Sequence, residues 1–307
     1  MYLEKEDTAD FLIAGEIPRP TPKAGDVLVK VYATAVMPTE LRWDPTFHKP
    51  SGEPRPYPIV LSHEFSGVVE LVGADVDIVG IGEEVYGLND WYGNGAQAEY
   101  CLVSASALAP KPKSLNHTEA AVVPISALTA WQGLFEKAQL QRDQRVLIHG
   151  ASGGVGQFAV QLARWQGARV IATASAPNLD FVRALGADQV IDYRTTRFED
   201  VICDVDAVLD CVGGDMLDRS WGVLKSAGRL VTIATSSGET KDEDVRKAFM
   251  IVRADGEQLA QIGRMIDAGE LRVFVGGVLP LADARKAYED HPQTKVRGKI
   301  ALQVVES

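Results

Sequence analysis

Three glycines, Gly150, Gly153 and Gly156, follow the apolar run Val146–Ile148 and stand directly before a segment with helical spacing. One glycine permits a tight turn after a strand, and another lets the backbone approach a pyrophosphate. The start of the following helix offers unpaired N–H groups and the positive end of its dipole to the anion. A glycine triplet alone would suit any tight turn, but between a strand and a helix it predicts a dinucleotide-binding site.

The end of the next predicted strand indicates which dinucleotide is bound. The segment Thr173–Asn178 reads TASAPN and contains no acidic residue. NAD sites usually carry Asp or Glu here to bind the ribose 2′-hydroxyl, and a carboxylate would repel a 2′-phosphate. Hydroxyl and amide donors suit that phosphate, so the segment favours NADPH, and Tyr193 and Arg194 could approach the same group. The alternative is that Ser175 and Asn178 only cap the following helix.

The elements around these residues are those of an α/β protein. After residue 117, compact apolar runs alternate with segments of helical period, which is typical of βαβ units around a parallel sheet. Helical spacing is clearest in 155–163, and Gly167 follows as a C-terminal cap. Six strands indicate a doubly wound sheet. The predicted strands are Val146–Ile148, Val170–Ala172, Val190–Ile191, Ala207–Leu209, Leu230–Ile233 and Met250–Val252.

Residues 1 to about 116 have a different texture. They are rich in Pro and Gly and contain short apolar runs that alternate with polar residues, which predicts an irregular β domain. The clearest runs are Val27–Tyr32, Gly67–Val72 and Ala98–Val103. The stretch after about residue 258 contains one β-like run, a helix and a strand, too little for a core of its own. We therefore expect it to complete the first domain.

Composition places the chain among globular proteins. It has 307 residues, of which 46% are hydrophobic and 24% charged, so there is room for two domains, and a disordered or fibrous chain is excluded. A net charge of -11 without a Lys/Arg-rich run predicts that neither nucleic acid nor a membrane surface is a partner. Three cysteines without paired spacing, and an N-terminus with acidic residues in place of a secretory signal, predict a cytoplasmic protein.

Further motifs accompany the glycine turn: Leu128–Trp131, Leu185–Asp188, Ile191–Tyr193 and Asp210–Gly214. Together, over nearly the whole chain, they resemble the medium-chain dehydrogenase/reductase superfamily and most of all its zinc-free NADPH:quinone oxidoreductases, the zeta-crystallin-like branch. The resemblance implies a GroES-like catalytic domain at 1–116, an NADP-binding Rossmann domain at 117–258 and a return segment at 259–307. It also implies an active-site cleft between the domains, and a homodimer formed through edge strands near 215–238.

The resemblance also transfers the family's cofactor contacts to positions of this chain. Asn178 stands where some relatives have a lysine near the phosphate, and Lys295, Arg297 or Lys299 could supply a cation instead. With the residues of the glycine turn and of the second strand, the predicted NADPH contacts are Thr129, Gly150, Ser152, Gly153, Gly154, Val155, Gly156, Thr173, Ser175, Asn178, Tyr193, Cys211, Val212, Gly213, Ile233, Ala234 and Thr235.

The segment Ser62–Gly67 resembles the part of the zinc alcohol dehydrogenases in which a histidine binds catalytic zinc. Such a zinc needs about three protein ligands, and where those enzymes have a cysteine this chain reads Ala35–Glu40, with Met37 as a poor ligand. We therefore expect no metal, and we expect His63 to be a hydrogen-bonded residue of the cleft or core. Without a metal, a developing oxyanion would be met by backbone N–H groups, water, or side chains such as Tyr57 or His63.

These features predict an NADPH-dependent oxidoreductase that reduces quinones or α,β-unsaturated carbonyls (enones or enals) by hydride transfer. A quinone or an enone needs less electrophilic help than a simple ketone, which fits the missing zinc ligands. Two alternatives stay open: an enoyl reductase that acts on a carrier-bound thioester, and an NADPH-binding sensor or structural protein without turnover. Met37, and the lack near Arg42 of a tyrosine that some relatives carry, motivate the sensor alternative.

Overall fold

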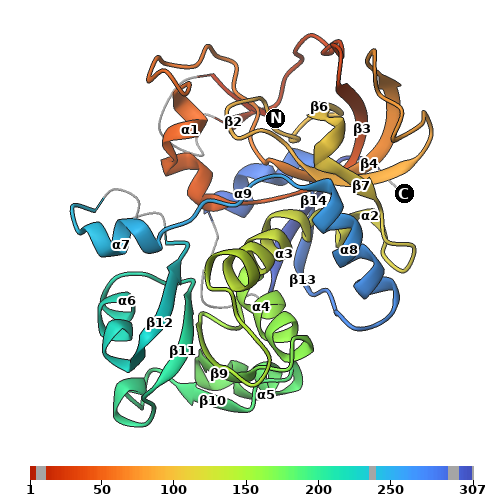
Figure 1. Ribbon diagram of the computed structural model, residues 1–307. Coiled ribbons are helices and arrows are strands. Elements are labelled where there is room, and N and C mark those ends of the chain that lie inside the picture. The colour runs from red at the N-terminus through yellow and green to blue at the C-terminus, as the bar shows by residue number, and fades with distance from the viewer. Residues whose placement is uncertain (5–11, 235–239, 290–296, 306–307) are drawn as a thin grey trace. The chain divides into compact units, whose positions relative to one another are not determined.

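The structure is a computed structural model that describes residues 1–4, 12–234, 240–289 and 297–305 (Figure 1). The chain divides into two compact units. The first consists of Met1–Ile125 together with Ala254–Ser307, and the second of Ser126–Arg253. As predicted, the last part of the chain returns to the first unit.

The first unit is built on a mainly antiparallel sheet with the strand order β13-β14-β3-β4-β5-β7, in which β6 also pairs with β3. Its strands are β3 (Asp26–Ala35), β4 (Glu64–Val72), β5 (Glu84–Leu88), β6 (Tyr100–Ser104), β7 (Leu108–Pro110), β13 (Val275–Pro280) and β14 (Lys299–Gln303), with β1 (Tyr2–Leu3) and β2 (Leu12–Ile13) as a separate pair. Its helices are α1 (Asp44–Phe47), α2 (His117–Ala121), α8 (Gly256–Asp267) and α9 (Ala284–Glu289). The short strands confirm the irregular β texture.

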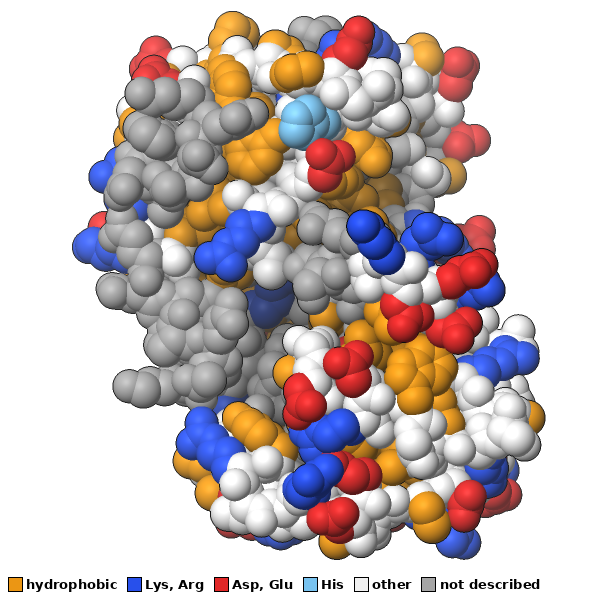
Figure 2. All heavy atoms as spheres, turned by 90° about the vertical axis from the view of Figure 1, so that its left-hand side faces the viewer, with side chains coloured by type: hydrophobic (Ala, Val, Ile, Leu, Met, Phe, Trp, Pro, Cys, Tyr) orange, Lys and Arg blue, Asp and Glu red, His pale blue; other side chains and the backbone are white. Residues whose placement is uncertain are grey.

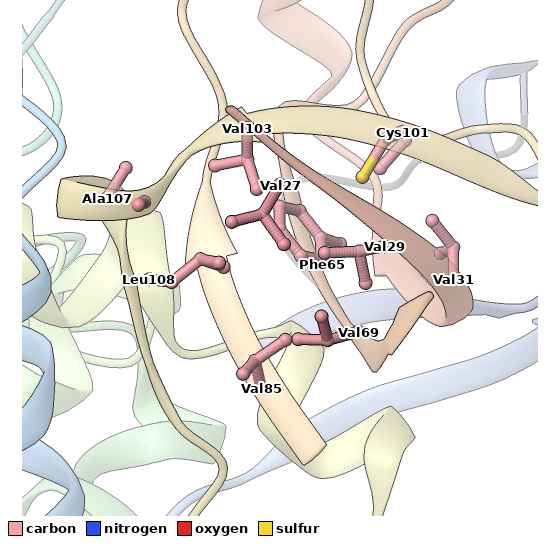
Figure 3. Packing of buried hydrophobic residues seen from close by; sticks show 12 residues of the cluster. Val27, Val29, Val31, Phe65, Val69, Val85, Cys101, Val103, Ala107 and Leu108 are labelled. Carbon is pink, nitrogen blue, oxygen red and sulfur yellow. The ribbon is translucent and has the colours of Figure 1, made fainter. Parts of the chain in front are cut away.

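Alternating side chains of β3 form the centre of this unit's core. Val27, Val29 and Val31 are all 0% exposed, as the period of two in a strand requires when one face is buried. Figure 3 shows Val27 and Val29 pointing toward the ring of Phe65 from β4, which is also fully buried. The predicted run Val27–Tyr32 is thus confirmed as a strand.

The two units differ by a few residues from the domains expected at 1–116 and 117–258. The helix α2 packs against β3 and β4 of the first unit, and α8 packs against β7 of the same unit. The helical period that begins near residue 117 suggested that α2 belongs to the other unit. The spacing of hydrophobic residues indicates whether a segment is a helix or a strand, but not the sheet against which it packs.

The second unit is a parallel sheet with the strand order β10-β9-β8-β11-β12 (Figure 1). Its strands are β8 (Arg145–His149), β9 (Arg169–Ala174), β10 (Gln189–Asp192), β11 (Val205–Asp210) and β12 (Leu224–Thr232). The helices are α3 (Pro124–Trp131), which begins at the end of the first unit, α4 (Gly154–Trp165), α5 (Leu179–Ala184), α6 (Asp215–Ser220) and α7 (Glu243–Ala248). The predicted Rossmann-type α/β fold is confirmed.

The helix α4 shows why this unit forms as predicted. Phe158, Ala159 and Leu162 lie on one helical face and are all fully buried, so that face packs on the sheet. Gly167 follows the helix with φ +84° and donates its N–H to the carbonyl of Arg164 at 2.9 Å. A positive φ favours glycine, which therefore ends the helix.

The described residues form five paired strands in this sheet, and the predicted sixth, Met250–Val252, is not a strand. A single parallel bridge joins Thr232 to Phe249 at the edge. Beyond this bridge, the side chain of Gln132 binds both backbone polar groups of Arg253. Its Nε2 donates to the carbonyl of Arg253 at 3.0 Å, and its Oε1 accepts from the Arg253 N–H at 3.1 Å. Three apolar residues alone do not distinguish a strand from a packed loop.

His149, the last residue of β8, is a fully buried polar residue of this unit. Its Nδ1 lies 3.0 Å from the hydroxyl of Thr173, and its Nε2 lies 2.9 Å from that of Ser220. Because Ser220 donates its own proton to the carbonyl of Met216 at 2.6 Å, it accepts from Nε2–H, and Nδ1 accepts from Thr173. Burial lowers the pKa of His149 to about 4, so the ring is neutral at pH 7.

The surface carries charges of both signs. On the face shown in Figure 2, Lys and Arg side chains are interspersed with Asp and Glu side chains. None of the helices in the described part of the chain has the length and apolar character needed to span a bilayer.

Replacing His149 by glutamine is expected to flatten the pH dependence of the second unit's stability. An unfolded histidine takes up a proton near its ordinary pKa of 6.5, but the buried ring does so only near 4. The unfolded chain therefore binds more protons between these values, and stability falls as the pH falls through this window. In urea denaturation, the wild type should lose about 2 kcal/mol more unfolding free energy than His149→Gln between pH 7 and pH 5. Equal losses would contradict a neutral, buried ring.

Candidate functional site

The glycine turn joins β8 to α4 with very little space between strand and helix. Gly150 has φ +69°, a conformation that favours glycine. A Cβ atom at Gly156 would lie 2.2 Å from the carbonyl oxygen of Gly150 and 2.6 Å from Cα of Ala151. Only glycine therefore allows the helix to begin this close to the strand.

The first turn of α4 presents backbone donors. Gly153 is the N-cap, and the first bond of the helix runs from the N–H of Gln157 to the Gly153 carbonyl at 3.1 Å. The N–H groups of Gly154, Val155 and Gly156 precede that bond, and the glycine N-cap has no side chain to bind them. With the helix dipole, these donors fit a pyrophosphate. The predicted contacts that the structure brings together here are Gly150, Ser152, Gly153, Gly154, Val155 and Gly156.

The strand order reverses beside this turn. From β8 the chain adds β9 and β10 on one side and then β11 and β12 on the other. Ligands of doubly wound sheets bind at such a switch point, at the carboxyl ends of the strands. A Cβ atom on Gly150 would lie 3.2 Å from Cγ2 of Val212 and 3.4 Å from Cβ of Cys211. The loop after β11 therefore adjoins the glycine turn, so two predicted sets of cofactor contacts lie together.

The predicted nicotinamide contacts follow β11 and β12. Cys211–Gly213 come directly after β11, and Val212 within them is 53% exposed. Ile233 and Ala234 come directly after β12, and Thr235 lies outside the described residues. The structure therefore places the described members of both segments at the carboxyl edge of neighbouring strands.

Sequence reasoning missed the carboxylate at the end of β11. Asp210 is fully buried and accepts hydrogen bonds from the N–H groups of Val212 and Gly213 and from the hydroxyl of Thr232. Burial and then the charge of Asp210 raise the pKa of the Cys211 thiol far above its usual range, which leaves this cysteine a poor nucleophile. An aspartate followed closely by glycines is typical of an Asx turn, and that signal was present in the sequence.

The predicted 2′-phosphate contacts meet at the ends of β9 and β10. Tyr193 donates its N–H to the carbonyl of Ala174 at 3.3 Å, which brings the turn after β10 beside the end of β9. Asn178 donates its Nδ2 to the hydroxyl of Ser175 at 3.4 Å. Neither of these two side chains caps a helix, so the capping alternative is not supported. The Arg194 guanidinium lies 5.8 Å from the Tyr193 ring.

Two further predicted contacts are buried threonines. Thr173 bonds His149 through its hydroxyl and accepts from the N–H of Ala151 at 3.3 Å through its carbonyl. Its side chain thus belongs to the core behind the glycine turn. Thr129, in the middle of α3, is 4% exposed.

In the first unit, His63 is enclosed and Tyr57 is not. His63 is 1% exposed, with Nδ1 3.1 Å from Oε1 of Glu40 and Nε2 3.3 Å from the carbonyl oxygen of Gly93. Both ring nitrogens lie against oxygen atoms of the protein, so neither remains for a substrate. Glu40, which the sequence analysis did not single out, also accepts from the N–H of Ser62 at 2.7 Å. Tyr57 is 37% exposed.

A buried arginine supports the same loop. Arg55 is 7% exposed and donates to the carbonyl oxygens of Thr46 at 3.0 Å and Gly93 at 2.6 Å. Burial lowers the pKa of its guanidinium, and the charges of Asp90 and Glu40 oppose that effect. Gly93 thus accepts from both Arg55 and His63, which ties α1 to the loop around Gly93.

Three basic residues near the end of the chain were considered as cations for the phosphate. Lys299 donates to Oε1 of Glu64 in the first unit, and Oε2 of Glu64 accepts from the N–H of Ile125 at 2.8 Å. Burial raises the pKa of the Glu64 carboxyl, and the charge of Lys299 opposes that effect. Lys295 lies outside the described residues, and Arg297 lies in the short described stretch before β14. Lys299 is therefore occupied by a structural ion pair.

The structure also bears on the metal question. No group of three His, Cys, Asp or Glu side chains gathers as a ligand set within the residues that the structure describes. Met37, at the position where zinc enzymes have a cysteine, is half-buried directly before a 3₁₀ turn, Pro38–Arg42.

Comparisons with known proteins agree with this architecture. Residues 23–113 match the alcohol dehydrogenase GroES-like domain, and residues 185–302 match the zinc-binding dehydrogenase family. The chain is 32% identical over 312 residues to a probable zinc-binding oxidoreductase, mitochondrial, of Arthroderma benhamiae, an alignment that covers 94% of this chain and 92% of that protein.

Solved structures extend the likeness to the whole fold. The quinone oxidoreductase from Coxiella burnetii has a TM-score of 0.89 and 30% identity, with 99% of this chain and 98% of that chain covered. A mycobacterial protein complexed with NADPH has a TM-score of 0.83 and 28% identity, with 99% and 98% covered. With its glycine turn, its switch point and its GroES-like unit, the chain belongs to the medium-chain dehydrogenase/reductase superfamily, in the quinone oxidoreductase-like branch.

Proposed function

We propose that this protein is an NADPH-dependent oxidoreductase that reduces quinones or α,β-unsaturated carbonyls by hydride transfer without a metal ion. The observation that carries the proposal is a pyrophosphate cradle at α4 combined with an end of β9 that has no acidic residue. Two similar structures, one of a quinone oxidoreductase and one of a protein complexed with NADPH, support the choice of acceptor and of cofactor.

The second unit holds the cofactor, whose reduced nicotinamide supplies the hydride when bound. The N–H groups of Gly154–Gly156 hold the pyrophosphate. The hydroxyl of Ser175 and the amide of Asn178 are neutral donors for the 2′-phosphate. Arg194 forms no ion pair with a described acid, so its guanidinium can supply the cation that position 178 lacks.

The first unit offers an aromatic pair to a flat acceptor. The rings of Trp43 and Trp91 meet edge to face with centroids 4.6 Å apart, and the His63 ring lies 5.1 Å from Trp91. Both tryptophans are half-buried. Planar conjugated rings pack well against such a pair.

The oxyanion and proton donors are assigned from how exposed each candidate side chain is. Hydride addition to a quinone or an enone leaves an oxyanion that needs hydrogen-bond donors and a proton. His63 has both ring nitrogens engaged, so we assign the donor role to the more exposed Tyr57. Metal independence rests on Met37, because a thioether is not among the usual ligands of catalytic zinc.

Substitutions at the end of β9 should change the cofactor preference. Asn178→Lys is expected to tighten NADPH about tenfold, because a lysine pairs with the 2′-phosphate. Ser175→Asp should weaken NADPH by at least about tenfold, because the carboxylate repels that phosphate. Fluorescence titration with NADPH and NADH measures both changes. NADH lacks the phosphate, so its affinity for Asn178→Lys should stay within about twofold of its affinity for the wild type. Equal changes in the affinities for NADPH and NADH would mean that the phosphate binds elsewhere.

Removing metal ions should leave the activity unchanged. After dialysis against EDTA and 1,10-phenanthroline, single-turnover oxidation of bound NADPH by 1,4-benzoquinone, 9,10-phenanthrenequinone or an enone should keep its rate. Added zinc should not raise it. A rate that falls on chelation and returns with zinc would show a metal enzyme and overturn this part of the proposal.

Tyr57→Phe should slow the same single-turnover reaction by about 100-fold, because positioned acids contribute at least this much. The affinity for NADPH should not change, since Tyr57 lies in the first unit. Tyr92→Phe is the matched control, because Tyr92 is similarly exposed at 40%. If Tyr57→Phe and Tyr92→Phe react as fast as the wild type, the proton comes from water or from another side chain.

A further inference from the structure

Asp210 is a buried carboxylate with several donors and no positive partner among the described residues. It is 0% exposed. Its oxygens accept from the N–H of Val212 at 3.0 Å, from the N–H of Gly213 at 3.0 and 3.1 Å, and from the hydroxyl of Thr232 at 2.7 Å. Every contact is a donor, so the carboxylate form satisfies all of them. A buried charge that is held only by hydrogen bonds is costly unless its geometry is complete.

Thr232 connects Asp210 to a second loop by hydrogen bonds. Its hydroxyl oxygen accepts from the N–H of Ala234 at 3.2 Å, so its single proton is directed to Asp210. The backbone carbonyl of Asp210 also accepts from the N–H of Ile233 at 3.0 Å. One residue thus binds the start of the loop after β12 as well as the loop after β11.

The two loops carry the described residues that were predicted to contact nicotinamide, Cys211–Gly213 and Ile233–Ala234. Gly213 has φ +80°, a backbone shape that the paired Asp210 oxygens hold in place. The first of these loops also adjoins Gly150 of the pyrophosphate turn. In contrast, the hydrogen bonds of Asp210 and Thr232 given above do not involve the predicted phosphate contacts at the ends of β9 and β10.

We propose that Asp210 and Thr232 are positioning residues that hold Cys211–Gly213 and Ile233–Ala234 in the shape that binds the nicotinamide half of the cofactor. The proposal rests on the proposed function, because it requires NADPH to bind at this switch point. A role in folding alone is the competing account. It predicts that loss of the pair weakens the whole site, whereas positioning predicts that only the nicotinamide half suffers.

The test compares NADPH with adenosine 2′,5′-bisphosphate, which carries the adenosine half alone, by calorimetric titration of the full chain. Thr232→Val removes the hydroxyl and keeps the shape of the side chain. We expect it to weaken NADPH by about tenfold and to leave adenosine 2′,5′-bisphosphate within about twofold. Thr232→Ser restores the hydroxyl and should restore NADPH affinity. Ser226→Ala, an exposed hydroxyl on the same strand, is the matched control and should change neither affinity.

Asp210→Asn gives a second variant, with thermal unfolding as the check that it folds. It should show the same selective loss, because an amide nitrogen cannot accept from the loop N–H groups. Equal weakening of both ligands, or unchanged NADPH affinity in folded Thr232→Val, would overturn the positioning role. A wild type that binds adenosine 2′,5′-bisphosphate and NADPH equally well would also overturn it. A wild type that binds neither ligand removes the proposed function itself.

Discussion

The contact between Gly156 and the carbonyl of Gly150 is the constraint on which the cofactor unit depends. Any side chain at position 156 would collide with backbone atoms, which cannot move aside as a flexible side chain can. This close approach sets the first turn of α4 directly above the end of β8. It also leaves Gly150 in contact distance of the loop after β11. The backbone donors in the first turn of α4 and the position of the loop after β11 therefore both depend on how tightly one helix starts on one strand.

Several buried polar groups of each unit find their partners inside that unit. His149 remains neutral between two hydroxyls, and Asp210 is held by N–H and O–H donors. In the first unit, Glu40 pairs with His63, and Glu64 with Lys299. Breaking one partner of such a pair leaves an uncompensated group in the interior, which costs more than the contact itself contributes. These networks therefore specify loop shapes more than they add stability.

Some parts of the site are formed by backbone groups and others by side chains, and this difference explains which site residues could be predicted. A glycine turn that presents backbone N–H groups is a pattern written in consecutive residues, and the structure has this turn where it was predicted. Side-chain networks join residues distant in the chain. Glu40 and His63 meet across 23 positions and Asp210 and Thr232 across 22, and no local spacing indicates such pairs. Lys299 was considered for the phosphate because its charge is evident from the sequence, whereas its pairing with Glu64 is not.

The sequence by itself determined the two kinds of unit, the glycine turn with its helix, five of the strands in the parallel sheet and the acid-free end of β9. Period, glycine positions and residue type are local properties, and they suffice for these features. Only the tertiary structure decided that α2 packs in the first unit and that the side chain of Gln132 binds where a sixth strand was expected. It also decided that His63 is closed to substrate and that Asp210 joins two loops. Such outcomes depend on which distant donors and acceptors meet in a buried place, where each polar group must find a partner.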